Sequence, residues 1–149
     1  MRHKKKGKKL NRNTHQRKAL FKRLIQSLIL NEELKTTESK AKAIKGLVDK
    51  LITKAKKGGL SVRRQILAFL QNKKITAKLI DEIAPRCKSR TSGFTKIIRL
   101  GKRRGDKAMM VKMELTEKKK KEKKNKKGEK KNSKKSNKKL DGKIEKKKK

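Results

Sequence analysis

Positive charge is the feature that most limits what this chain can fold into. Of its 149 residues, 53 are Lys or Arg and 13 are Asp or Glu, so the formal net charge is +40. Charge of one sign opposes compaction unless the phosphates of a polyanion neutralise it. The sequence therefore predicts RNA or DNA as the partner. A membrane surface is a weaker candidate, because interfacial anchors add Trp or Phe to a basic face and this chain has no Trp and three Phe.

The uneven distribution of charge predicts a boundary near residue 117. Residues 118–149 contain 19 of the 53 basic residues, all of them Lys, and 4 of the 13 acids. Their only apolar side chains are Leu140 and Ile144, too few to offset the entropy lost on folding. We therefore expect a disordered Lys-rich tail at 118–149, a basic arm at 1–13 and a single domain at 14–117.

The lone Cys87 excludes an internal disulfide and fits a reducing cytoplasm. We also expect no export signal and no membrane span, because the densest apolar stretch, residues 24–30, is short and interrupted by Gln26 and Ser27.

Four helices are predicted between residues 14 and 85 from apolar side chains that recur at helical spacing. A short extended segment at 33–36 separates the first two. The expected starts are near Thr14, at the cap Thr37, at the cap Ser61 and near Thr76. The expected ends are Asn31, Gly58 with Gly59, and Pro85.

The period changes to that of a strand after a basic loop at 86–93. Residues 94–100 alternate, and a second strand places Met109, Val111, Met113 and Leu115 on one face. A basic hairpin loop at 101–106 joins the two strands. The expected fold class is α+β, with about four helices packed on a small two- to three-stranded sheet that ends in a β-hairpin.

The N-terminal arm is the first predicted RNA-binding cluster. Gly7 lets the backbone approach phosphates, and Arg12 and Arg17 extend the basic surface onto the first helix. The alternative is a solvated arm without a partner. The candidates before Arg12 are Arg2, His3, Lys4, Lys5, Lys6, Gly7, Lys8 and Lys9.

Two loops supply the second cluster, and we expect the fold to bring them together at one end of the sheet. Arg63 and Arg64 are further candidates, because they open the third helix where backbone N–H groups favour an anion. For the loops and for Arg63 and Arg64 the alternative is a solvated surface. With two per cent aromatic residues, recognition should depend on phosphate and shape. The loop candidates are Arg86, Lys88, Arg90, Lys102, Arg103 and Arg104.

An enzyme is the hypothesis from another class, and the sequence offers little for it. It contains no HExxH, no paired CxxC, no Walker loop and no GxSxG. Cys87 with His3 or His15 could be imagined as a nucleophile pair, but a packed cysteine is the simpler reading. We predict no catalytic residue, no metal, no cofactor and no small-molecule substrate.

Three segments resemble, in order and spacing, the bacterial large-subunit ribosomal protein seventeen family. They are MRHKKKGKKLNRNTHQRKALFKRL, LKTTESKAKAIKGLVDKLITKAKKG and TSGFTKIIRLGKRRGDKAMMVKMEL. The resemblance implies a cytoplasmic component of the large ribosomal subunit that binds its rRNA near the peptide tunnel exit, beside other ribosomal proteins, and supports translation without catalysis. It also implies helices against a small sheet. Where the family commonly has Gly-Gly-Tyr, this chain has Ser92, Gly93 and Phe94.

A nucleoid-associated, histone-like DNA-binding protein is the main rival, because such a protein would use a Lys-rich tail. Against it, this tail has no Ala or Pro repeats, and the Arg residues lie in short loops of a domain rather than along one extended helix. A preference for duplex DNA over structured RNA would favour the rival.

Overall fold

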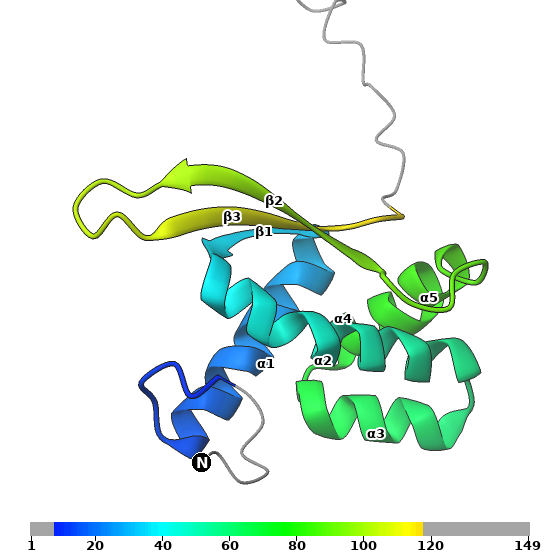
Figure 1. Cartoon of the computed structure of the whole chain (residues 1–149). Helices are drawn as coiled ribbons and strands as arrows, with labels where there is room; N and C mark the ends of the chain where they lie inside the picture. Colours follow the sequence, from blue (N-terminus) through cyan, green and yellow to red (C-terminus); the bar gives the residue numbers. More distant parts are fainter. Residues whose placement is uncertain (1–7, 118–149) are drawn as a thin grey trace, which may run out of the picture. The chain divides into compact units, whose positions relative to one another are not determined.

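The described part of the chain begins with helices and one short strand and closes with a β-hairpin (Figure 1). The computed structural model describes residues 8–117. Helices packed against a three-stranded antiparallel sheet confirm the predicted α+β class. In chain order the elements are α1 (Thr14–Asn31), β1 (Glu33–Thr37), α2 (Glu38–Lys57), α3 (Leu60–Leu70), α4 (Lys73–Ala77), the π-helix η1 (Lys78–Ile83), α5 (Ala84–Arg86), β2 (Thr95–Lys102) and β3 (Met109–Leu115).

The first two helices begin and end where the sequence predicts. Asn13 caps α1, because its side-chain oxygen accepts a hydrogen bond of 2.8 Å from the backbone N–H of Gln16. Thr37 precedes α2 as predicted, although its side chain makes no capping hydrogen bond. Gly58 ends α2 with φ at 69°, a left-handed value that glycine adopts without steric cost.

The prediction that Ser61 caps the third helix is wrong. The cap is Gly59, and α3 begins at Leu60. Gly59 turns the chain with φ at 87°, and its carbonyl accepts the N–H of Arg63 at 3.1 Å, which closes the first helical turn. Ser61 therefore lies inside the helix.

The fourth helix begins three residues before the predicted Thr76, because Asn72 caps it. The Asn72 side chain accepts the N–H of Ile75 at 3.1 Å. The Thr76 hydroxyl donates to the Asn72 carbonyl at 2.8 Å, so Thr76 supports the first turn from within the helix.

The prediction that Pro85 ends this helix is also wrong, because helical structure continues through α5 to Arg86. The preceding turns are π-helical, and the N–H of Ala84 bonds to the carbonyl of Leu79, five residues back. A proline ring normally clashes with the carbonyl four residues earlier in an α-helix. The wider π turn moves that carbonyl and accommodates the ring.

The sheet has the strand order β1-β3-β2, with β3 in the centre and both neighbours antiparallel to it. The extended segment predicted at 33–36 is therefore an edge strand. The hairpin ladder continues to Lys102, past a register shift between Arg99 and Gly101. The hairpin loop is consequently 103–108, not 101–106, because the bulge lets pairing extend beyond Gly101.

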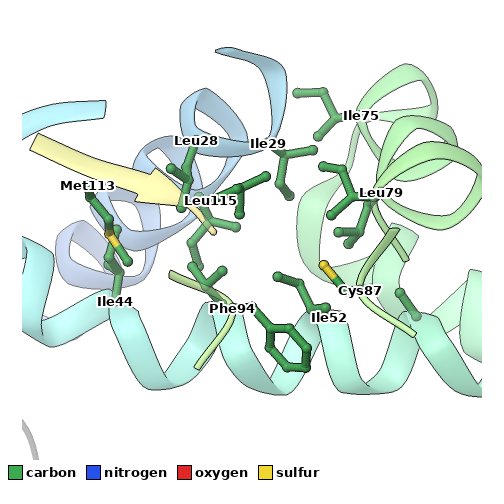
Figure 2. Close-up of a cluster of buried hydrophobic side chains, with 14 of the residues drawn as sticks. Leu28, Ile29, Ile44, Ile52, Ile75, Leu79, Cys87, Phe94, Met113 and Leu115 are labelled. Carbon is green, nitrogen blue, oxygen red and sulfur yellow. The ribbon is translucent and has the colours of Figure 1, made fainter. Parts of the chain in front are cut away.

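The core lies between the sheet and the helices that cover one of its faces (Figure 1). The predicted inner face of β3 is confirmed, since Val111, Met113 and Leu115 are at most 2% exposed. Figure 2 shows Met113 beside Ile44 of α2. The other labelled members of this cluster are Leu28, Ile29, Ile52, Ile75, Leu79, Cys87, Phe94 and Leu115.

Candidate nucleic-acid interface

The two basic loops lie at opposite ends of the sheet, so the prediction that they converge is wrong. The first basic loop, residues 86–93, leads into Thr95, which pairs with Leu115. The hairpin loop, residues 103–108, follows Lys102 at the other end of the same strand (Figure 1). Because an eight-residue strand spans roughly 25 Å, loops that flank it cannot meet.

Arg86, a predicted RNA contact in the first basic loop, is held inside the protein. Its guanidinium donates to both carboxylate oxygens of Glu32, at 2.6 and 3.1 Å. It also donates to the carbonyls of Glu82 and Glu117, at 3.1 and 3.2 Å. The carboxylate of Glu32 raises the pKa of Arg86 above its ordinary value. The two-pronged, largely buried pair with Glu32 joins α5 to the residue before β1, and the bond to Glu117 joins α5 to the segment just after β3.

Arg90 also faces the protein, whereas Lys88 faces solvent. The Arg90 side chain donates to the Glu117 carboxylate at 2.9 Å, and the Arg90 carbonyl accepts a hydrogen bond from Lys56. Lys88 is exposed and makes no side-chain hydrogen bond or ion pair within the described residues. Of the three predicted contacts in this loop, Lys88 is therefore the most available to a partner.

Cys87 lies in this loop and is 1% exposed. Burial raises the pKa of its thiol, which keeps the side chain protonated and unreactive. It packs in the core beside Leu79 and Ile52, as Figure 2 shows. The reading of Cys87 as a packed residue is thus supported, and His15, exposed on α1, lies outside this core.

The hairpin loop carries its positive charge outward. Arg103 pairs with Asp106 of the same loop, with Nε 3.1 Å from one carboxylate oxygen. Lys102, Arg104 and Lys107 are exposed and make no side-chain hydrogen bond or ion pair with any residue of 8–117. Lys107, which the sequence reading missed, thus joins the predicted Lys102 and Arg104 on this surface.

The described end of the N-terminal arm folds back on the start of α1. Arg12 donates to the carbonyl of Leu10 at 3.2 Å, and Arg17 donates to the carbonyl of Arg12 at 3.0 Å. Lys8 and Lys9 are exposed. The other predicted arm residues lie outside the described residues, namely Arg2, His3, Lys4, Lys5, Lys6 and Gly7.

Of the two predicted contacts on α3, Arg63 and Arg64, one is paired with a carboxylate of the protein and the other is not. Arg63 forms an ion pair with Asp81 of η1 at 2.9 Å, and both side chains are about half exposed. Arg64 is exposed and makes no ion pair with a described residue. Only Arg64 is thus without a carboxylate partner at the start of α3.

Most basic side chains of the described region have no carboxylate near them. Residues 8–117 contain 30 Lys and Arg, of which seven form an ion pair with another described residue. Since only nine acids lie in this range, the remaining charge requires a counter-charge from outside the domain. The seven paired residues are Lys42, Arg63, Arg86, Arg90, Arg99, Arg103 and Lys112.

Within 8–117, no group of three His, Cys, Asp or Glu side chains is placed to hold a metal ion. A depression between α2 and α3 is lined by Leu47, Leu51, Ile66 and Phe69 together with Lys50, Lys54 and Gln65, and it contains no carboxylate. No described helix is both long and apolar enough to span a bilayer.

Known proteins resemble this chain over most of its length. The family model described as "Ribosomal protein L17" matches residues 20–116. A protein of Syntrophotalea carbinolica named "Large ribosomal subunit protein bL17" is 43% identical over 117 residues, which cover 78% of this chain and 76% of the relative. Proteins of the same name from Trichlorobacter lovleyi and Pelobacter propionicus are 43% and 44% identical over 78% of this chain and cover 94% and 92% of their own lengths.

Proposed function

The chain belongs to the ribosomal protein L17 family, and from this premise we propose that it binds large-subunit rRNA through phosphate and shape recognition and thereby supports translation. Members of this family are structural components of the large ribosomal subunit, so the protein is a cytoplasmic ribosomal component and not an enzyme. The proposal adds the chemistry by which it joins the subunit.

The single observation that carries the proposal is the unpaired charge of the described domain. Because 23 of its 30 basic side chains have no carboxylate partner among residues 8–117, the phosphates of a surrounding polyanion would relieve the self-repulsion of the domain. Release of counterions from the phosphates then drives binding.

Two surfaces supply the proposed phosphate contacts. One is the N-terminal arm with the start of α1, where Lys8, Lys9 and Arg12 are exposed. The other is the hairpin loop, with Lys102, Arg104 and Lys107. We assign Arg86 to the structure of the sheet end instead, because all of its described contacts are internal.

Recognition by shape follows from the shortage of aromatic side chains. Proteins that read unstacked RNA bases use exposed aromatic rings as stacking platforms. Of the three Phe, Phe94 is 1% exposed in the core, Phe21 is partly buried against it, and Phe69 is 39% exposed, so a single exposed ring is too little for a stacking platform. Phosphate and ribose contacts to structured rRNA are therefore the expected mode, with neighbouring large-subunit proteins as further partners.

The test is sedimentation of a cell lysate through a sucrose gradient after a moderate salt wash. The position of this protein in the gradient is compared with those of the small-subunit and large-subunit rRNAs. We expect stoichiometric migration with the large-subunit rRNA. A protein with Lys102, Arg104 and Lys107 all changed to Ala should be lost from that peak at lower salt than the wild type. Loss of the wild type itself at moderate salt, or migration with DNA, would reject the proposal and favour the nucleoid alternative.

A further inference from the structure

We propose that Asp106 holds the hairpin loop in its RNA-binding conformation and that Arg103 acts through this carboxylate, as a positioning residue, rather than by its own contact with phosphate. This inference rests on the proposed rRNA-binding function. It assigns a requirement for binding to an acidic side chain on a surface that must meet a polyanion.

The Asp106 carboxylate accepts three hydrogen bonds from its own loop. The Arg103 Nε and Nη2 groups donate to its two oxygens at 3.1 and 2.5 Å, and the backbone N–H of Ala108 donates at 3.2 Å. The backbone N–H of Arg103 donates to the Ala108 carbonyl at 2.9 Å. The first three bonds join both ends of the loop to one carboxylate, and the backbone bond joins the two ends to each other.

The backbone of this loop needs such a restraint. Gly105 and Lys107 have φ at 97° and 51°, on either side of Asp106. A residue with a Cβ atom rarely adopts the left-handed value seen at Lys107 and does so only when its surroundings enforce it. The hydrogen bonds of Asp106 to Arg103 and to Ala108 provide that enforcement.

The restraint determines where the free charges lie. With the loop closed, Lys102, Arg104 and Lys107 are held around the turn, and none of them contacts a carboxylate among the described residues. Because Arg103 commits two donors to Asp106, it has fewer left for a forked grip on phosphate. The three unpaired residues are thus the contacts, and Arg103 with Asp106 sets their spacing.

The ionised carboxylate is well suited to this role. Arg103 and the N–H of Ala108 lower the pKa of Asp106 to about 2, so it stays charged wherever RNA is stable. The negative charge of Asp106 also neutralises the positive charge of Arg103 locally. The pair therefore lowers the net positive charge of the loop while it fixes the backbone. Such an arrangement favours binding when the positions of the remaining charges matter more than their number.

The positioning role and a direct Arg103 contact predict opposite effects for one substitution. If Arg103 touches phosphate itself, Asp106→Ala frees its guanidinium, adds one net positive charge and strengthens binding. If Asp106 positions the loop, the same change weakens binding of a large-subunit rRNA fragment about threefold or more, despite the added charge. Glu82→Gln is the control, because it removes an exposed acid on η1 away from this loop.

The experiment measures affinity for the rRNA fragment by filter binding at fixed salt, with the full chain. We expect Arg103→Ala and Asp106→Ala to weaken binding to a similar extent, the double variant to add little, and Glu82→Gln to bind as tightly as the wild type or more tightly. Binding by Asp106→Ala that equals or exceeds that of Glu82→Gln would overturn the proposal.

Hydrogen exchange of the Ala108 amide in the free protein separates this proposal from the proposed function. We expect faster exchange in Arg103→Ala and Asp106→Ala and no change in Arg104→Ala. Unchanged exchange in Asp106→Ala would overturn the positioning role even if rRNA binding is confirmed. A wild type that binds no rRNA, with exchange altered as expected, would reject the proposed function and leave the pair a purely structural one.

Discussion

The loops at the two ends of β2 are both rich in basic residues, yet they use them differently. In the first basic loop, Arg86 and Arg90 contact carboxylates that lie far away in the sequence, those of Glu32 and Glu117. In the hairpin loop, the carboxylate that Arg103 contacts belongs to the loop itself. The first loop therefore fastens distant elements to one another, whereas the hairpin loop shapes itself and leaves its other charges to a partner.

From this difference we infer that the placement of the acids determines the role of each basic residue in so cationic a chain. Residues 1–117 contain 34 Lys and Arg but nine Asp and Glu, so there are too few carboxylates to pair with most of the basic side chains. An Arg beside a carboxylate has a structural task, and one without it is available to phosphate.

Phe94 directly follows the first basic loop, and its substitution should have the largest effect on stability. Its ring is 1% exposed, and its N–H donates to the Asp49 carboxylate at 3.3 Å. We expect Phe94→Ala to lower the free energy of unfolding by about 3–5 kcal/mol, because it leaves a cavity in the core. Urea denaturation followed by circular dichroism measures this. Leu100→Ala, at a side chain 52% exposed near the other end of β2, should cost less than about 0.5 kcal/mol.

Arg86→Ala should give the next largest effect. The side chains of Arg86 and Glu32 are 22% and 15% exposed, so this ion pair is less screened by water than a surface pair. We expect a loss of about 2–3 kcal/mol in urea denaturation, because the substitution removes charge-assisted hydrogen bonds to a largely buried carboxylate. Arg90→Ala is the control and should cost about 0.5 kcal/mol, because its pair is more exposed. Equal losses would contradict the structural role given to Arg86.

Substitutions in the first basic loop should have the larger effect on stability, whereas substitutions in the hairpin loop should have the larger effect on rRNA binding. Arg104→Ala removes a charge with no carboxylate partner in the described region, so the slope of log affinity against log salt should fall by about one. Arg90→Ala should change the slope less, because Glu117 already neutralises that side chain. Filter binding at four or more salt concentrations measures both. A larger change for Arg90 would remove the distinction between the loops.

The smallest effect concerns pH and the hairpin loop alone. The folded protein lowers the pKa of Asp106 to about 2, below its ordinary value. Its contribution to loop order is therefore complete above about pH 4 and is lost as the pH falls through about 2. The chemical shift of the Ala108 amide should titrate in that range and should not do so in Asp106→Asn. A midpoint near pH 4 would show that Arg103 does not hold the carboxylate.

Much of the fold could be predicted because local patterns determine it. The alternation along β3 and the helical spacing of α1 and α2 depend on residues close in sequence. The predictions for Ser61 and Pro85 are wrong because these residues depend on the backbone of their neighbours, namely the positive φ of Gly59 and the π-helical turns of η1 that precede Ala84. A propensity for capping or breaking a helix does not contain that information.

The site was less predictable, because which Arg finds a carboxylate is a long-range property. Arg86 and Glu32 are 54 residues apart, and only the tertiary fold brings the end of α5 to the turn between α1 and β1. Arg103 and Asp106 are three residues apart, so that pair could have been read from the sequence. The opposite placement of the two loops could also have been deduced, since both flank a single strand.

We propose that the hairpin loop faces rRNA and that the first basic loop does so less. Lysine acetylation followed by mass spectrometry tests it directly, by comparing the free protein with the intact large subunit. Lys102 and Lys107 should be strongly protected in the subunit, and Lys88, the exposed lysine of the first basic loop, should be protected much less. Protection of Lys88 with full modification of Lys102 and Lys107 would contradict the account.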